Sequence, residues 1–192
     1  VSRDAGVTWT IEHDGLHAHY SIGRNFLRGV GDLLARYGSD AAFLKLDDGV
    51  IMDGQTEVGS TLDVVILGVA VEHALYPTGY NPDKRDDPVC FYVGESERDA
   101  KPDAASPAPQ AASCKECPKN AFGSHPGGRG GKACGQRRRL LVLVLGDGDD
   151  ADKAPLRRLR VPPTSVAILG GYVGLVAAHK RPVQSVVTTI EI

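Results

Sequence analysis

The chain has 192 residues, which suits one domain or one domain with an excursion, and 42% of them are hydrophobic, enough for a buried core. The formal net charge of −2 gives no general attraction to a polyanion, although basic residues crowd the stretch from 132 to 160. No apolar run approaches the roughly 18 residues of a membrane span, and no secretory signal is visible. We therefore expect a cytoplasmic protein whose thiols stay reduced.

The first part of the chain predicts three strands and a helix. Residues 16–22 alternate between apolar and polar side chains, which predicts a half-buried strand. Residues 25–37 have apolar side chains at helical spacing, which favours a short helix weakened by glycine. Residues 43–46 form a short predicted strand that ends at a turn. Residues 61–71 are almost continuously apolar and β-branched, which predicts a central strand buried on both faces.

Three more strands and a loop are predicted further along the chain. Residues 89–93 form a strand that carries Cys90. Residues 98–113 are rich in alanine and proline and lack any periodicity, which predicts a flexible loop. Strands are expected again at 139–145 and, with looser alternation, at 156–161.

The C-terminal part predicts a helix and a last strand. Apolar residues recur at helical spacing from 166 to 178, and Thr164 or Ser165 can cap this helix. Residues 186–192 form a final strand. Six or seven strands with no long helices between them favour a mainly β fold, an antiparallel Greek-key barrel or sandwich, over a βαβ fold.

The cysteines of the chain are Cys90, Cys114, Cys117 and Cys134. Cys114 and Cys117 form a Cys-x-x-Cys pair, which can bind one side of a metal from a tight turn, while the two outlying cysteines close the other side. This spacing predicts a structural zinc site with four thiolate ligands. Two disulfides, an iron–sulfur cluster, a redox-active Cys-x-x-Cys pair and free thiols are the alternatives.

The cysteine positions also predict how the chain is organised. Cys90 lies on a predicted strand and Cys134 lies just before another, with the Cys-x-x-Cys pair between them. A metal bound by all four would attach an insertion, at residues 95–138, to the wall of a single domain that spans residues 1–192. His125 is a spare ligand in the same segment, although four thiolates already suffice.

A glycine-rich stretch at residues 127–132 lies within this insertion. It fails the phosphate-loop pattern, because Ala133 stands where a serine or threonine would bind magnesium. Its backbone amides, together with Arg129 and Lys132, still suit a contact with a phosphate. A flexible loop without a ligand is the alternative.

Arg137, Arg138 and Arg139 give the strongest indication of a polyanion partner, although such runs are often solvated faces. Strand alternation would place Arg137 and Arg139 on one face and Arg138 on the other. One face must meet the core, so we expect either that pair or Arg138 alone to contact a polyanion.

Aromatic residues accompany these cations. Phe122 lies among the basic residues of the insertion, and Tyr80 and Tyr92 are further candidate stacking rings. Aromatic rings interleaved with basic residues on a β-barrel suit single-stranded nucleic acid, where bases stack and phosphates pair with cations. The alternative places Phe122 in a small core of the cysteine-rich insertion itself.

Indications of catalysis are weak. His17 and His19 share a strand face and could chelate a metal, but solvated histidines explain them as well. Asp147, Asp149 and Asp150 could hold a divalent ion, but their Gly-Asp-Gly-Asp context is first a turn. Nothing in the spacing is typical of a catalytic triad or of paired carboxylates, so we expect no enzyme.

Several segments follow one another in the order found in one protein family. They are Val64-Val-Ile-Leu-Gly68, Tyr76 and Tyr80, Pro88-Val-Cys-Phe91, Cys114-x-x-Cys-Pro-x-Asn-x-Phe-Gly-Ser124, Gly131-Lys-Ala-Cys134, Arg137-Arg-Arg-Leu-Leu-Val142 and Pro162-Pro-Thr-Ser165. With these segments the chain resembles the zinc-containing single-stranded DNA-binding proteins of tailed bacteriophages, over about residues 60–192.

The resemblance implies an OB-like barrel with a zinc knuckle whose ligands are the four cysteines. It implies non-catalytic binding of single-stranded DNA in phage replication or recombination, inside the host cell. Phage replication proteins and a second copy of the chain are further candidate partners. Such proteins often end in an acidic tail, and this chain ends at Glu191-Ile192, so we expect the tail to be absent or removed. The alternative function is a zinc-stapled protein-interaction module of a replication or defence-evasion complex, without DNA contact.

Overall fold

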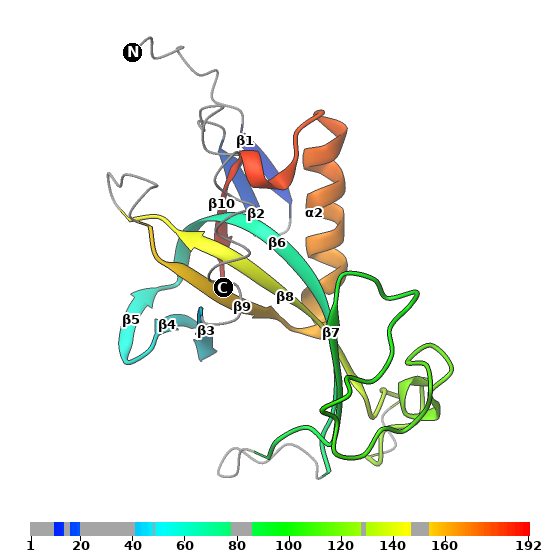
Figure 1. Cartoon of the computed structure of the whole chain (residues 1–192). Helices are drawn as coiled ribbons and strands as arrows, with labels where there is room; N and C mark the ends of the chain where they lie inside the picture. Colours follow the sequence, from blue (N-terminus) through cyan, green and yellow to red (C-terminus); the bar gives the residue numbers. More distant parts are fainter. Residues whose placement is uncertain are drawn as a thin grey trace. The chain divides into compact units, whose positions relative to one another are not determined.

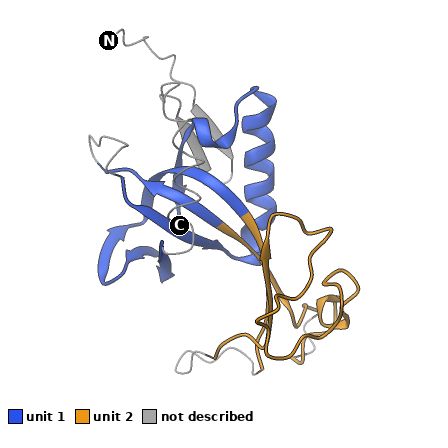
Figure 2. Cartoon of the chain, in the orientation of Figure 1, with its two compact units in different colours: residues 1–69, 140–192 blue, residues 70–139 orange. Residues whose placement is uncertain are grey.

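The structure is a computed structural model that describes residues 41–47, 49–77, 86–127, 130–146 and 154–192, together with the backbone of two strands at 10–13 and 16–19 (Figure 1). The chain forms two compact units (Figure 2). The first contains residues 1–69 and 140–192, and the second contains residues 70–139. The second unit thus includes the predicted insertion at 95–138 and begins earlier. That the chain is a single domain with an insertion stays a prediction.

The described residues contain ten strands and one α-helix. The strands are β1 (Thr10–His13), β2 (Leu16–His19), β3 (Ala42–Asp47), β4 (Val50–Asp53), β5 (Thr56–Gly59), β6 (Thr61–Leu75), β7 (Cys90–Gly94), β8 (Gly135–Val144), β9 (Leu156–Val161) and β10 (Val187–Glu191). The helices are α2 (Val166–Ala178) and the short 3-10 helices η1 (Pro118–Asn120), η3 (Pro163–Ser165) and η4 (Val183–Ser185). Among them is no helix long and apolar enough to cross a membrane.

The strands form a mixed sheet in the order β1-β2-β10-β6-β8-β9-β3-β4-β5, with β7 paired to the second half of β6. In the first unit this sheet curls into a half-barrel (Figure 1). The expectation of an antiparallel sheet was wrong in one place, because β3 and β9 pair in parallel, with Phe43 opposite Arg158. A hairpin joins only antiparallel strands, whereas these two come from distant parts of the chain and can pair either way.

The prediction of six or seven strands was too low. The strands β4 and β5, which form an unpredicted hairpin, are joined at Gly54, whose φ of 64° lies in the left-handed region that glycine adopts without strain. The predicted strands at 43–46, 61–71, 89–93, 139–145, 156–161 and 186–192 correspond to β3, β6, β7, β8, β9 and β10. The strand at 16–22 is found as β2. The predicted helix at 25–37 and the acidic turn at 147–150 lie outside the described residues.

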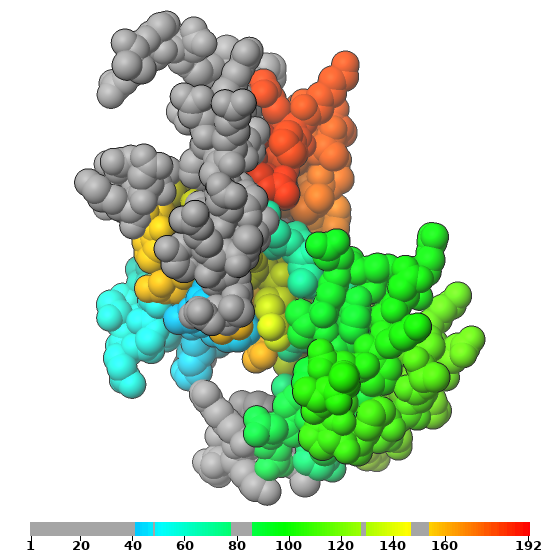
Figure 3. Space-filling view, viewed as in Figure 1, coloured from blue at the N-terminus to red at the C-terminus, as the bar shows by residue number. Residues whose placement is uncertain are grey.

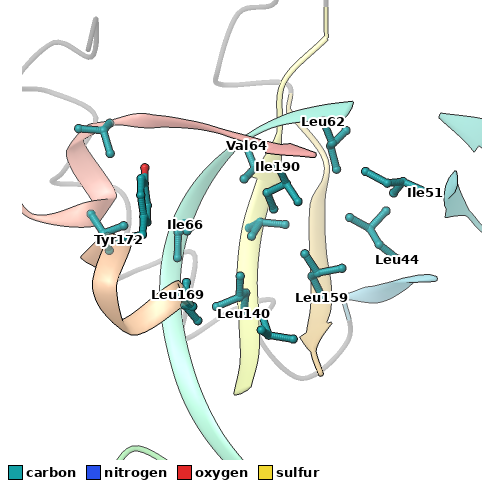
Figure 4. Packing of buried hydrophobic residues seen from close by; sticks show 14 of the residues in the cluster. Leu44, Ile51, Leu62, Val64, Ile66, Leu140, Leu159, Leu169, Tyr172 and Ile190 are labelled. Carbon is teal, nitrogen blue, oxygen red and sulfur yellow. The ribbon is translucent and has the colours of Figure 1, made fainter. Parts of the chain in front are cut away.

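The helix predicted at 166–178 is confirmed as α2, and Ser165 occupies its N-cap position without a side-chain capping bond. Apolar side chains of the helix and the sheet form the main core of the first unit (Figure 4). Tyr172 of α2 is fully buried there, and its hydroxyl lies 2.7 Å from that of Thr188 on β10. This core gives the first unit a source of stability of its own.

The strand β6 is buried on both faces in its first half, as its apolar run predicts. Val64 and Ile66 belong to the main core, whereas Val65 and Leu67 form a second cluster with Leu143 of β8. All four β6 side chains are at most 1% exposed. The strand then continues into the second unit, where it pairs with β7.

The alanine- and proline-rich segment 98–113 has no regular secondary structure, as its composition predicts. It is nevertheless bonded along β7. Asp103 and Ala108 donate backbone N–H groups to the carbonyls of Phe91 and Val89, at 2.8 and 2.7 Å, and the Ser106 hydroxyl accepts from the Phe91 amide. Figure 3 shows the residues of this part of the chain, in green, as one continuous group of atoms. The hydrogen bonds favour a segment held in place; its flexibility stays a prediction.

Candidate functional site

The hairpin of β6 and β7 places the first cysteine. In its register Leu75 lies opposite Cys90 and His73 lies opposite Tyr92. Opposed residues of an antiparallel pair share a face of the sheet, and so do residues two apart. Cys90 and His73 therefore lie on the same face of this hairpin, and the other cysteines reach that face from the irregular segments.

A tight turn around Cys114 and Cys117 forms because its backbone groups are paired locally. Cys117 is the N-cap of η1, and Pro118 occupies the first position, where a missing N–H costs nothing. The Asn120 side chain donates to the Cys114 carbonyl at 2.8 Å, and the Asn120 amide donates to the Cys117 carbonyl at 2.9 Å. The Cys134 amide donates to the Lys119 carbonyl at 2.8 Å, which attaches the fourth cysteine to this turn.

The four cysteines line one small pocket of the second unit, together with His73. Cys90, Cys114 and Cys134 are at most 8% exposed, and Cys117 is half-buried. All four are free thiols, so the structure contains neither of the two alternative disulfides. Across the described residues, no group of three or more His, Cys, Asp or Glu side chains is arranged so that it could hold a metal ion. The sulfurs are thus gathered without a finished coordination geometry.

The surroundings of Cys114 and Cys134 favour the neutral form of their thiols. Burial, followed by the neighbouring thiols of Cys90 and Cys117, raises the pKa of Cys114. Burial, again with the other thiols, raises the pKa of Cys134 to about 11, and a hydrogen bond from the Ala74 backbone opposes part of this rise. Thiols with raised pKa values are protonated near neutral pH, so a cation must bind to hold them as thiolates.

The residues that line the pocket are of the types that bind zinc, although their side chains are not arranged around a metal position in this structure. Zinc takes four thiolates in structural sites, and four thiols line this pocket. His73 adds a buried imidazole, 1% exposed, whose two ring nitrogens have no hydrogen-bond partner among the described residues. His125 is exposed, and its Nδ1 accepts a hydrogen bond from the Gly127 amide at 3.0 Å, so it is not placed to serve as a fifth donor.

Phe122 is the most exposed large hydrophobic side chain among the described residues, with 82% of its surface accessible. The alternative that Phe122 forms a small core of the insertion was therefore wrong. The Lys132 ammonium lies 4.8 Å from the centre of its ring, and the same ammonium donates to the Asn120 and Gln136 side chains at 3.2 and 3.3 Å. An aromatic face and a cation are thus held together at the surface.

The three consecutive arginines differ in their partners. Arg139 forms an ion pair of 2.7 Å with Glu72, a residue only 3% exposed. Arg138 forms an ion pair of 3.0 Å with Glu97, whose other oxygen accepts a hydrogen bond from Gln136. The half-buried Arg137 has no ion pair or side-chain hydrogen bond within the described part of the chain. Of the three, Arg137 is the one without a carboxylate partner in the part of the chain that the structure describes.

The remaining candidates contribute less. Tyr92 is half-buried, its hydroxyl donates to the Ser96 carbonyl at 2.8 Å, and its ring occupies the space beside Gly94, where a Cβ would lie 2.2 Å from the hydroxyl. Tyr92 therefore acts mainly within the fold. Tyr80 and Arg129 lie outside the described residues, and the side chains of His17 and His19 do as well.

Sequence reasoning missed three residues of this region: His73, Glu72 and Glu97. A signal for the first two was available, because Glu72-His73 interrupts an otherwise apolar strand. Buried polar residues in such a run need a specific partner. No protein-family model, curated protein or solved structure matches this chain.

Proposed function

We propose that the protein binds single-stranded DNA without catalysing a reaction, through a zinc-stabilised surface of its second unit. The observation that carries this proposal is the exposed Phe122 ring with the Lys132 ammonium 4.8 Å from its centre. Nucleobases stack on exposed aromatic faces, and ammonium groups pair with the adjoining phosphates. Because the Phe122 ring is exposed, it contributes little to the core, and binding a ligand is the role that its position favours.

Arg137 is the second expected contact with the DNA backbone. Its guanidinium has no partner among the described residues, whereas Arg138 and Arg139 are each paired with a carboxylate. Arg129 and Tyr80 remain proposed contacts from the sequence. The sequence predicted that either the pair Arg137 and Arg139 or Arg138 alone contacts DNA. We propose Arg137 as the phosphate ligand, because Arg139 is paired with Glu72 and Arg138 with Glu97.

The cofactor in this proposal is a zinc ion held by Cys90, Cys114, Cys117 and Cys134. Their convergence on one pocket supports it, and so does the lack of disulfides among them. Bound zinc would supply a fixed crosslink between β7, the turn at η1 and the start of β8, and it carries no chemistry of its own here. Held in this way, the segment between Cys117 and Cys134 would present Phe122 and Lys132 at a constant spacing.

The finer fold and the biological setting belong to the same proposal. We infer an OB-like Greek-key barrel from the curled mixed sheet, with the second unit as its inserted zinc knuckle. From the resemblance to phage single-stranded DNA-binding proteins, we propose that the protein acts in replication or recombination in the host cytoplasm. Replication proteins and further copies of the chain are the expected protein partners.

Replacing Phe122 by alanine tests the proposal. We expect affinity for a fluorescent oligonucleotide to fall by about 1–3 kcal/mol, with a nearly unchanged salt dependence, because stacking releases few ions. Phe122→Tyr should bind as the parent does. Val93→Ala, which shortens another exposed apolar side chain of the same unit, is the matched control and should also bind normally. Parental affinity in folded Phe122→Ala would place the stacking surface elsewhere.

Glu97 is expected to compete with DNA for Arg138. The substitution Glu97→Gln replaces the carboxylate that pairs with Arg138 by a neutral amide. The Arg138 guanidinium then becomes available to a phosphate. An ion pair near the surface is worth about 0.2–1 kcal/mol, so we expect affinity to rise by a factor of roughly 1.4 to 5. The slope of log affinity against log salt should steepen by about 0.7 for one added phosphate contact.

Glu95→Gln is the control for this experiment. It removes the same charge two residues away, from an exposed side chain with no ion pair among the described residues. It should raise affinity less and leave the salt slope nearly unchanged. Equal effects of the two substitutions would mean that only net charge matters and that Arg138 makes no specific contact.

A protein-interaction module is the second candidate function. The pairing of Arg138 and Arg139 with carboxylates favours it, since it leaves fewer free cations for a polyanion. An exposed phenylalanine can also anchor a protein interface. Oligonucleotide titrations separate the two functions, because such a module would bind neither single-stranded nor duplex DNA.

A further inference from the structure

His73 is a buried polar side chain that the fold leaves without a hydrogen bond. It lies on β6, it is 1% exposed, and neither Nδ1 nor Nε2 has a partner within the described residues. Burying an imidazole without a hydrogen bond is unfavourable, and native proteins rarely leave such groups unsatisfied. A position that needed only apolar packing would be filled better by phenylalanine or leucine. The ring therefore needs a partner that the described side chains do not supply.

The surroundings of His73 indicate where that partner belongs. His73 lines the same small pocket as the four cysteines, and it lies on the same hairpin face as Cys90. The backbone of the next residue, Ala74, lies beside Gly135, the residue after Cys134, where a Cβ would be 3.6 Å from the Ala74 carbonyl oxygen. The ring also meets Tyr92, with 6.1 Å between the ring centres and the planes tilted by 56°, which is a packing contact. The side-chain acceptors that line the pocket are the four cysteine sulfurs and the amide oxygens of Gln110 and Asn120. The Asn120 oxygen already accepts from Lys132, and the sulfurs are the acceptors that become ionised when a metal binds.

Resting on the zinc site proposed above, we propose that His73 donates its ring N–H to a cysteine thiolate and thereby stabilises the metal-loaded pocket. Four thiolates around one divalent zinc leave two excess negative charges in a largely buried space. Hydrogen bonds to ionised sulfur are stronger than those to a neutral thiol, so the partner that His73 lacks would become available when the pocket is loaded. His73 would be a positioning residue, with the four cysteines as the ligands. Groups that donate to metal ligands are typically worth a factor of about 10–100 in metal affinity.

The test compares His73→Phe, which keeps a ring and removes the N–H, with His73→Gln, which keeps an N–H donor. Zinc affinity of the full chain is measured by competition with a chromophoric chelator. We expect His73→Phe to bind zinc about 10–100-fold more weakly than the parent, and His73→Gln to recover most of that loss. Tyr172→Phe, which removes a buried hydroxyl in the first unit, is the control and should keep parental zinc affinity.

Cobalt(II) substitution gives a readout that a purely structural role would not move. A hydrogen bond lowers the energy of the sulfur lone pairs, so its removal in His73→Phe should shift the sulfur-to-cobalt charge-transfer band to longer wavelength. His73→Gln should shift the band less. If His73→Phe does not fold, as judged by circular dichroism, His73→Leu and His73→Gln carry the same comparison.

The possible outcomes separate this inference from the zinc proposal. A parent protein that holds no zinc when purified and reconstituted would overturn both. A parent that holds zinc, with His73→Phe of equal affinity and unchanged cobalt spectrum, would overturn the role of His73 alone. Loss of thiolate-to-cobalt intensity in His73→Phe, beyond a shift of the band, would also contradict the inference, since it would make His73 necessary for ligation itself.

Discussion

Serine in place of Cys134 is expected to reduce bound zinc from about one ion per chain to almost none, and to loosen the second unit. Cys134 is 8% exposed and attaches the start of β8 to the turn at η1 through its backbone. A serine hydroxyl is a poor zinc ligand, and metal binding supplies much of the folding free energy of small thiolate modules. Elemental analysis measures the metal, and amide hydrogen exchange measures the loosening.

Hydrogen exchange should also show where the effect stops. The first unit has its own core around Tyr172, so amides of α2 are expected to keep their protection in Cys134→Ser. Lys115→Ser is the matched control, because it changes an exposed residue between the paired cysteines that is not a ligand. Full zinc content in Cys134→Ser would show that Cys134 is not a zinc ligand. Iron in the parent protein would instead favour the iron–sulfur cluster.

Replacing Arg139 by alanine is expected to lower the free energy of unfolding by about 3 kcal/mol, because it removes the guanidinium that pairs with the buried Glu72 carboxylate. The side chain of Glu72 is 4% exposed, and two nitrogens of Arg139 lie 2.7 and 2.9 Å from one of its oxygens. The Arg139 side chain is 23% exposed, so we place the cost at the lower end for a broken buried pair. Urea denaturation at constant zinc measures it.

Arg137→Ala is the control for the arginine experiment. It lies two residues away on the same strand and has no ion pair among the described residues, so its effect on stability should be small. Its effect on DNA affinity should be the larger of the two when both proteins are folded. A cost below about 1 kcal/mol for Arg139→Ala would place the pair in the range of exposed ion pairs.

Elements with strong local patterns could be predicted from the sequence. The apolar run of β6, the helical spacing of α2 and the alternation in β9 each specify an element without knowledge of its neighbours. The hairpin of β4 and β5 was missed because its strands have four residues each and a mixed polarity. The parallel pairing of β3 with β9 was missed because nothing local encodes which distant strands become neighbours.

The sequence predicted the cysteines and arginines of the candidate site, but not which residues form ion pairs with the arginines. The cysteine spacing predicted one shared pocket, and the four thiols do line one. The arginine run suggested a basic surface, but Arg138 and Arg139 are paired with carboxylates 41 and 67 residues away in the chain. Such contacts depend on the fold. The exposure of Phe122 likewise depends on how its loop is folded, which residue type alone does not specify.

The proposed function is tested most directly by titrating fluorescent oligonucleotides, single-stranded and duplex, into the zinc-loaded full chain at several salt concentrations. We expect preferential binding of the single strand, weakening with salt along a slope of about −0.7 per phosphate neutralised. Equal affinity for single strand and duplex would indicate a generic polycation. Absence of binding to either, with zinc bound and the protein folded, would contradict the proposal and leave the protein-interaction module as the function to pursue.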